Sequence, residues 1–439
     1  MEHQVAPVTR ILPRSLCLSL TLAVPFAAPL GAQRGVGDGK IERVLVGEGA
    51  HAGMAFQVFT PANVRRGKFY PLVFGLHGNG NTAESHVRMM SDVSTDTAPV
   101  FIVAPSYQKE AKFNAPVAED AEGVFDAVLA QVLETYPIDR GRVVLQGFSM
   151  GAIYCTNWLN AIGTRPESEN APYSFCGVWL NSTAVVPRRS LGRTLPFLMF
   201  VGADETAILG TINIVENVRR AYMAMFQRGA DATYIEIPGM GHTVGSECLR
   251  LMRDSLGQIP DHSEALLPRH AKSFPEEQRL VTRGLFAAPL KTFEQAMEGA
   301  DRSLSSEARR ARDKVVTYLD KLARDTARKR EPSLTDYEQM LEIGLALETW
   351  DSEQALPFHD VSEKLADHKS IRDEITARTE LHNAQAALGE SRDAAIEALR
   401  ALGTGQNKDT AYGRRARSHL QALGEDVPFP FAATSRNRR

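Results

Sequence analysis

The apolar residues of this chain follow one pattern in its first half and another in its second. Between residues 41 and 237, short apolar runs alternate with segments whose apolar residues recur at helical spacing. Strands that alternate with helices form βαβ units, so the pattern predicts a doubly wound, mostly parallel sheet with helices on both faces. The predicted strands are 41–46, 56–60, 70–76, 100–104, 143–145, 175–180, 197–201 and 234–237, and the predicted helices are 82–90, 119–136, 150–159 and 212–228.

From about residue 268 the strand signals cease, and segments rich in Ala, Leu, Glu and Arg follow. They predict a second, all-α domain, in which the stretch from Ser333 to Asp336 has the pattern of a capped helix start. Residues 384–423 resemble a tetratricopeptide-like hairpin, although no repeat of fixed period runs through the region. The predicted helices are 290–298, 305–327, 334–350, 361–388, 391–402 and 411–423.

The amino terminus has the layout of a secretory signal peptide. Arg10 and Arg14 precede an apolar run at 16–30, and small residues follow it, which predicts cleavage after Ala32. The run is too short for a membrane anchor, so we expect an exported (periplasmic or extracellular) protein whose mature chain spans no membrane. The predicted order is signal peptide 1–32, linker 33–40, α/β domain 41–265, helical domain 266–428 and disordered tail 429–439.

Composition and charge exclude several classes of function. The formal net charge of -3 on 439 residues, with basic and acidic residues interspersed, argues against a nucleic-acid partner. Of four cysteines, Cys17 leaves with the signal peptide, and three are no disulfide framework, although two of them could pair. The simplest interpretation is that they are small buried residues. No cysteine or histidine spacing typical of zinc is present, so we predict no metal and no organic cofactor.

The strongest chemical signal is Gly147-Phe-Ser149-Met-Gly151, between a predicted buried strand and a predicted helix. A serine at so sharp a corner has a strained backbone and an exposed Oγ, and side chains at the flanking glycines Gly147 and Gly151 would collide with the strand or the helix. Ser149 is therefore the expected nucleophile. The alternative is a glycine-rich turn whose serine only caps the helix.

A serine nucleophile needs a base, an acid that orients the base, and donors for the oxyanion. His242, in a glycine-rich loop after the last predicted strand, is the expected base. Asp204 is the expected acid, preferred over the neighbouring Glu205 because it lies closer to the end of its strand. The order Ser, Asp, His is the order found in α/β-hydrolases.

Two backbone N–H groups are expected to form the oxyanion hole. One belongs to Met150, which follows the nucleophile at the start of a helix, and the other to the loop after His77, where we favour Asn79. His77 itself is interpreted as a residue that shapes this loop by bonding to backbone, with a role as base as the alternative.

Leu76-His-Gly78, Gly147-Phe-Ser-Met-Gly151, Gly202-Ala-Asp204 and Gly241-His242 together resemble the α/β-hydrolase superfamily. Within it, residues 118–152 resemble secreted esterases of the polyhydroxybutyrate depolymerase, feruloyl esterase and dienelactone hydrolase type. The chain departs from depolymerases at Asn79, where they tend to have cysteine, and after His242, where they tend to have a tryptophan nearby.

The resemblance implies an exported serine esterase that works through an acyl-enzyme. Only 182–195 lies between two predicted strands where lids are commonly inserted, so an open site for small, polymer-borne or glycan-borne esters is expected. Two alternatives stay open: a serine peptidase of the prolyl-oligopeptidase kind, and a helical interaction module, with a protein partner, beside a vestigial hydrolase domain.

Overall fold

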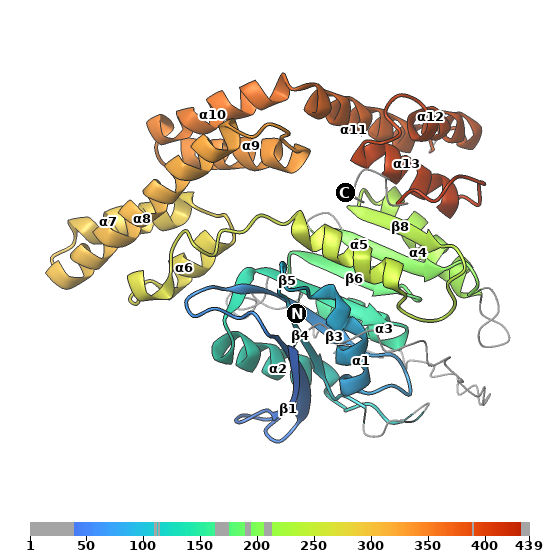
Figure 1. Ribbon diagram of the computed structural model, residues 1–439, viewed down its shortest axis with the longest axis horizontal. Helices are drawn as coiled ribbons and strands as arrows, with labels where there is room; N and C mark the ends of the chain where they lie inside the picture. The colour runs from blue at the N-terminus through green and yellow to red at the C-terminus, as the bar shows by residue number, and fades with distance from the viewer. Residues whose placement is uncertain are drawn as a thin grey trace, which may run out of the picture.

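The computed structural model describes residues 39–108, 112, 115–162, 175–188, 195–205, 213–388 and 390–431. Within these residues, eight strands form one sheet, and a series of helices follows it in the chain (Figure 1). The strands are β1 (Gly39–Leu45), β2 (Ala55–Pro61), β3 (Tyr70–Leu76), β4 (Phe101–Pro105), β5 (Ile138–Phe148), β6 (Gly177–Asn181), β7 (Phe197–Gly202) and β8 (Ala232–Ile237).

The strand order across the sheet is β1-β2-β4-β3-β5-β6-β7-β8. β1 pairs antiparallel with β2 and β2 antiparallel with β4, whereas every pair from β4 to β8 is parallel. The predicted mostly parallel, doubly wound sheet followed by helices is therefore confirmed. Because the parallel strands end at the same edge, the loops after β3, β5, β7 and β8 lie together there.

Helices cover both faces of the sheet. Successive side chains of a strand point to opposite faces, so Phe74 of β3 belongs to one core and Val73 to the other. On the Phe74 side pack α2 (Ala121–Thr135), α3 (Met150–Ile162) and α4 (Ile214–Gln227); on the Val73 side pack α1 (Ala83–Met90), with the 3-10 turn η1 (Ser91–Val93) after it, and α5 (Ser246–Gly257). The sequence analysis did not assign α5.

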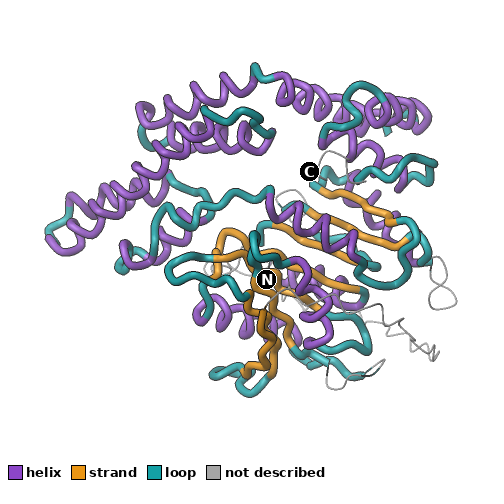
Figure 2. The backbone as a smooth tube through the Cα atoms, viewed as in Figure 1, coloured by secondary structure: helices purple, strands orange, loops and turns teal. Residues whose placement is uncertain are grey.

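The remaining helices form the second half of the chain, and Figure 2 draws them in purple. The prediction of one helix over 361–388 is wrong, because α10 ends at Ala366 and α11 begins at Lys369. Pro357 lies inside α10. After a short 3-10 turn η3 (Pro268–His270), the helices are α6 (Pro275–Thr282), α7 (Ala287–Glu298), α8 (Arg302–Ala327), α9 (Leu334–Glu348), α10 (Ser352–Ala366), α11 (Lys369–Ala387), α12 (Arg392–Thr404) and α13 (Ala411–Ala422).

The last helix returns to the sheet and covers its β8 edge (Figure 1). From α13, Ser418 Oγ donates a hydrogen bond to the carbonyl oxygen of Tyr234, and Arg415 Nη2 donates to that of Ala232 at 3.3 Å. His419 hydrogen-bonds with the hydroxyl of Tyr222 on α4. An uncovered edge strand would offer its backbone groups to another chain, so α13 protects the sheet from such pairing.

Some predicted segments lie outside the described residues. These are the signal peptide, linker residues 33–38 and tail residues 432–439, whereas Gly39 and Lys40 open β1. Phe429 and Phe431, predicted to start a disordered tail, pack against the core beneath α5. No helix in the described ranges is long and apolar enough to cross a membrane.

Candidate active site

Ser149 occupies the corner between β5 and α3 in a left-handed backbone conformation, with φ of +54°. Its N–H donates to the carbonyl oxygen of Asn181 at 2.8 Å, which ties the corner to the neighbouring strand β6. A Cβ at Gly147 would collide with the backbone of α3, and one at Gly151 with the carbonyl oxygen of Leu76. The packing thus requires both glycines, for the reason that the sequence suggested.

His242 follows β8 in the loop that leads to α5. Its Nε2 lies 3.1 Å from Ser149 Oγ, and its ring packs against Phe148 with the centroids 5.0 Å apart. A neutral imidazole with its proton on Nδ1 can accept the serine proton at Nε2. The structure therefore brings the predicted nucleophile and the predicted base into hydrogen-bond contact.

The carboxylate that bonds to the imidazole belongs to Glu205. The sequence analysis preferred its neighbour Asp204. His242 Nδ1 lies 2.8 Å from Glu205 Oε2, and the Glu205 side chain is fully buried. β7 ends at Gly202, and a tight turn follows, in which Glu205 N–H donates to the Gly202 carbonyl at 3.1 Å. This turn returns the third residue after the strand, Glu205, toward the sheet. Closeness to the strand end was thus a poor guide to the acid.

The second carboxylate oxygen of Glu205 has two donors. Ser182 Oγ donates to Oε1 at 2.8 Å, and the Gly202 N–H donates to the same oxygen at 2.7 Å. Ser182 follows β6 directly and is fully buried. The sequence analysis missed Ser182 because no motif marks it. A buried carboxylate with all these bonds is held in one orientation.

The predicted oxyanion donors lie on either side of the serine corner. Met150 is the first residue of α3, where N–H groups lack an acceptor within the helix. On the other side, a Cβ at Gly78 would stand 3.3 Å from Ser149 Cβ, so the loop that carries Asn79 passes beside the nucleophile. The Asn79 side chain accepts a hydrogen bond from Gln108 Nε2 at 3.1 Å. The role of both N–H groups stays a prediction.

His77 shapes the loop after β3. Its Nδ1 lies 3.0 Å from the carbonyl oxygen of Gly78, and Tyr107 stacks on its ring with centroids 4.3 Å apart. The Tyr107 hydroxyl donates to the His77 carbonyl oxygen. Burial lowers the pKa of His77 to about 4, because the charged imidazolium loses solvation. The predicted backbone hydrogen bond of His77 is confirmed.

A chain of buried polar side chains lies below the serine corner. His86 Nε2 on α1 lies 2.7 Å from Gln146 Oε1 on β5, and Gln146 Nε2 donates to Asn181 Oδ1 at 3.1 Å. Asn181 also accepts the Ser149 N–H through its backbone oxygen. Burial, with a smaller contribution from His77, lowers the pKa of His86 to about 3. His86 is thus neutral where the protein is folded.

The stability of the protein should fall with decreasing pH because of His86. Its pKa is about 6.5 in an unfolded chain and about 3 here, so below pH 6.5 the unfolded state binds a proton that the folded state does not. From pH 7 to pH 5 this costs about 2 kcal/mol of unfolding free energy. In urea titrations, His86→Gln should lose about 2 kcal/mol less than the wild type over this interval.

The exposed His382 provides the matched control, and His382→Gln should change the pH dependence little. Equal losses of unfolding free energy in the wild type and in His86→Gln would show that the imidazole of His86 does not titrate as its burial requires.

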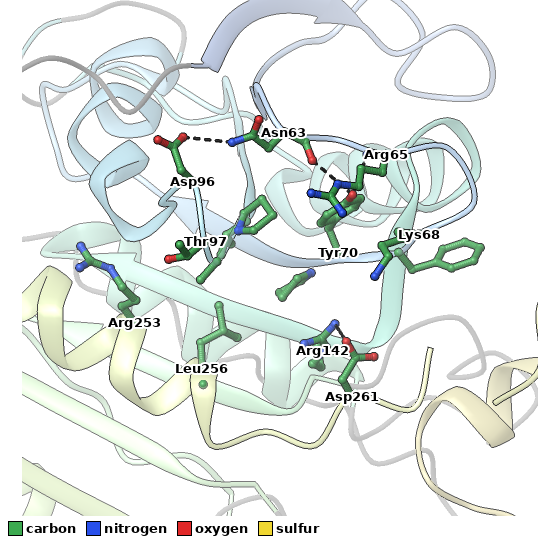
Figure 3. A pocket seen from close by; sticks show the side chains of 16 residues that line it. Asn63, Arg65, Lys68, Tyr70, Asp96, Thr97, Arg142, Arg253, Leu256 and Asp261 are labelled. Carbon is green, nitrogen blue, oxygen red and sulfur yellow. Dashed lines mark hydrogen bonds and ion pairs between the residues drawn. The ribbon is translucent and has the colours of Figure 1, made fainter. Parts of the chain in front are cut away.

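A cavity of about 540 Å³ lies at the opposite edge of the sheet (Figure 3). Tyr70, at the start of β3, and Val100, just before β4, line it, whereas Ser149 follows the far end of β5. Three of its cations have partners: Arg142 Nη2 donates to Asp261 at 2.7 Å, Lys68 Nζ lies 3.3 Å from Glu264, and Arg253 donates to backbone carbonyls. This cavity is therefore separate from the serine corner.

The described ranges contain no group of three or more His, Cys, Asp or Glu side chains that could hold a metal ion.

The cysteines of the described residues, Cys155, Cys176 and Cys248, are free. Cys155 and Cys248 are fully buried, as predicted, and Cys176 is partly buried. Burial raises the pKa of Cys248 to about 12, so its thiol stays protonated and unreactive at neutral pH.

No protein-family model and no curated protein matches the chain. Among solved structures, it is similar to a thermostable esterase (18% identity over 49% of this chain and 63% of that one, TM-score 0.37). It is also similar to an esterase from the fungus Rhizomucor miehei (15% identity over 51% of this chain and 85% of that one, TM-score 0.40). A third similar structure is the feruloyl esterase module of Clostridium thermocellum (15% identity over 50% of this chain and 87% of that one, TM-score 0.35).

These alignments cover about half of this chain, and less than two thirds of the thermostable esterase. The fold assignment rests on the chain itself. Three features are typical of the α/β-hydrolase fold: the strand order, the strained serine between β5 and α3, and the chain order of Ser149, Glu205 and His242. Residues 39–257 have the α/β-hydrolase fold.

Proposed function

We propose that the protein is an exported serine hydrolase that cleaves carboxylic esters through an acyl-enzyme. One observation carries the proposal: a continuous line of hydrogen bonds runs from Ser149 Oγ through the His242 imidazole to the buried Glu205 carboxylate. A serine hydroxyl is unreactive alone, and this arrangement is what activates it.

In the acylation step, Ser149 Oγ attacks the ester carbonyl carbon while its proton moves to His242 Nε2. The carbonyl electrons pass to oxygen, and the N–H groups of Met150 and Asn79 stabilise the oxyanion. The tetrahedral intermediate then collapses, the bond to the alcohol oxygen breaks, and His242 returns the proton to the leaving alcohol. Glu205 holds the imidazole in the required tautomer and stabilises its charged form.

Water completes the cycle. It attacks the acyl carbon as His242 Nε2 takes one of its protons, and the second tetrahedral intermediate expels Ser149 Oγ, which regains the proton from His242. The carboxylic acid leaves and the enzyme is restored. None of these steps needs a metal or an organic cofactor.

The chain length between β6 and β7 supports an open site. Asn181 ends β6 and Phe197 begins β7, so the connection is too short to form a lid domain. An open site suits esters carried on polymers or glycans, or small exported metabolites. It differs from the enclosed pocket of a lipase. Export is proposed from the sequence of residues 1–32.

Hydrolysis of p-nitrophenyl acetate, butyrate and octanoate, with p-nitroanilides of the same acids, tests the proposal. We expect turnover of the short esters and little or no turnover of the anilides, because an amine is a poorer leaving group than a phenol. Faster turnover of the anilides than of the esters would favour the alternative of a serine peptidase of the prolyl-oligopeptidase kind. No turnover of any substrate by folded protein would favour a vestigial site, and with it the helical half as the working part.

A further inference from the structure

Two non-glycine residues of the described ranges have a positive φ: Ser149, at +54°, and Ser182, at +58°. They follow the neighbouring strands β5 and β6. For a residue with a side chain this backbone conformation is strained, and glycine would adopt it without cost. Strain of this kind persists where the side chain has a task, and the hydroxyl of Ser149 is the proposed nucleophile.

The hydroxyl of Ser182 bonds to the acid that supports this nucleophile. Ser182 Oγ donates to Glu205 Oε1 at 2.8 Å, while Glu205 Oε2 faces His242 Nδ1 at the same distance. The backbone of Ser182 needs no serine there, because its N–H donates to the Phe200 carbonyl oxygen at 2.8 Å, a bond that glycine would keep. The serine side chain is thus required only by the carboxylate.

The glutamate has a freedom that this bond removes. The terminal torsion of a glutamate is broad, so a carboxylate held at one oxygen by a single donor can rotate. The Gly202 N–H is the other donor to Oε1, at 2.7 Å. With Ser182 present, two donors at the ends of the neighbouring strands β6 and β7 converge on one oxygen, and the other oxygen is left to the imidazole.

We propose that Ser182 is a positioning residue of the proposed reaction, which acts on His242 through Glu205. This inference rests on the proposed function for its kinetic consequence, but the geometry that it claims, a carboxylate oriented by the Ser182 hydroxyl, is independent of turnover. The site thereby has four polar members, contributed by the ends of β5, β6, β7 and β8.

Ser182→Gly separates the hydroxyl from the backbone conformation. It removes the donor and also relieves the strain, so the two effects on stability offset each other in part and the variant should stay folded, while kcat falls roughly 10- to 100-fold, as expected for loss of one hydrogen bond to a charged group. KM should change less than about twofold, since Ser182 does not touch substrate. Ser91→Ala is the matched control: Ser91 is equally buried, and its hydroxyl donates to the Arg88 carbonyl oxygen at 2.8 Å.

A double-mutant cycle tests whether Ser182 acts through Glu205. In a Glu205→Gln background, Ser182→Gly should lower kcat less than about twofold, because the group it positions is already lost. A wild-type kcat in Ser182→Gly, or an equal loss in both backgrounds, would overturn the inference.

Proton NMR provides a readout that needs no turnover. The Nδ1–H of His242 should give a downfield resonance that is absent from His242→Ala, shifts upfield or broadens in Ser182→Gly, and is unchanged in Ser91→Ala. An unchanged resonance in Ser182→Gly would refute the positioning role even if the protein hydrolyses no ester. The resonance could shift in Ser182→Gly although the wild-type protein hydrolyses no ester. That result would support the positioning role and would contradict only the proposed esterase activity.

Discussion

Replacing Ser149 with alanine should lower kcat/KM for p-nitrophenyl butyrate at least about a thousandfold. The Oγ atom that lies 3.1 Å from His242 Nε2 is removed, and with it the proposed nucleophile. The remaining rate would come from binding and the oxyanion donors acting on water. The variant should unfold at nearly the wild-type temperature, because alanine has a similar cost to serine at a φ of +54°.

Rates measured together with thermal unfolding separate loss of chemistry from loss of fold. A folded Ser149→Ala variant that keeps more than about a tenth of the wild-type rate would exclude Ser149 as the nucleophile, since removal of a covalent nucleophile cannot cost so little.

Exchange of the acid should distinguish two adjacent carboxylates. Glu205→Gln keeps the size of the side chain but removes the charge and can present an N–H₂ to His242, which favours the wrong tautomer. A substitution of this kind lowers kcat by about 10⁴-fold. Asp204→Asn, the matched control one residue earlier, should stay within about threefold of wild type, because Glu205 and not Asp204 bonds to His242.

The kcat values of the two variants on one ester, with KM measured alongside, decide the assignment. A large loss in Asp204→Asn together with a small loss in Glu205→Gln would reverse it, and would require the turn after β7 to rearrange during the reaction.

The parts of the fold that could be predicted from the sequence are those with a local signal. Buried parallel strands leave continuous apolar runs, so β3 was placed at residues 70–76 as observed. The break between α10 and α11 has no such signal: neither glycine nor proline interrupts the sequence from Ala366 to Lys369. The return of α13 to β8 depends on contacts between residues almost two hundred positions apart, as in the bond from Ser418 to Tyr234.

The candidate site divides in the same way. Ser149 and His242 could be located because their residue types and their positions after strands are both visible in the sequence. The choice between Asp204 and Glu205 depended on a three-residue turn, which the sequence leaves open. The role of Ser182 could not be predicted, because it depends on a positive φ at a residue other than glycine. Such a backbone conformation is uncommon and has no signal in the sequence.

The most direct test of the account is covalent labelling with a fluorophosphonate, which phosphonylates an activated serine and is not released. Intact-mass and peptide mass spectrometry should find one phosphonyl group per wild-type chain, on the peptide that contains Ser149, none on Ser149→Ala, and slower labelling of Glu205→Gln. No adduct on folded wild-type protein, or an adduct that persists in Ser149→Ala, would contradict the claim that Ser149, His242 and Glu205 form a working catalytic site.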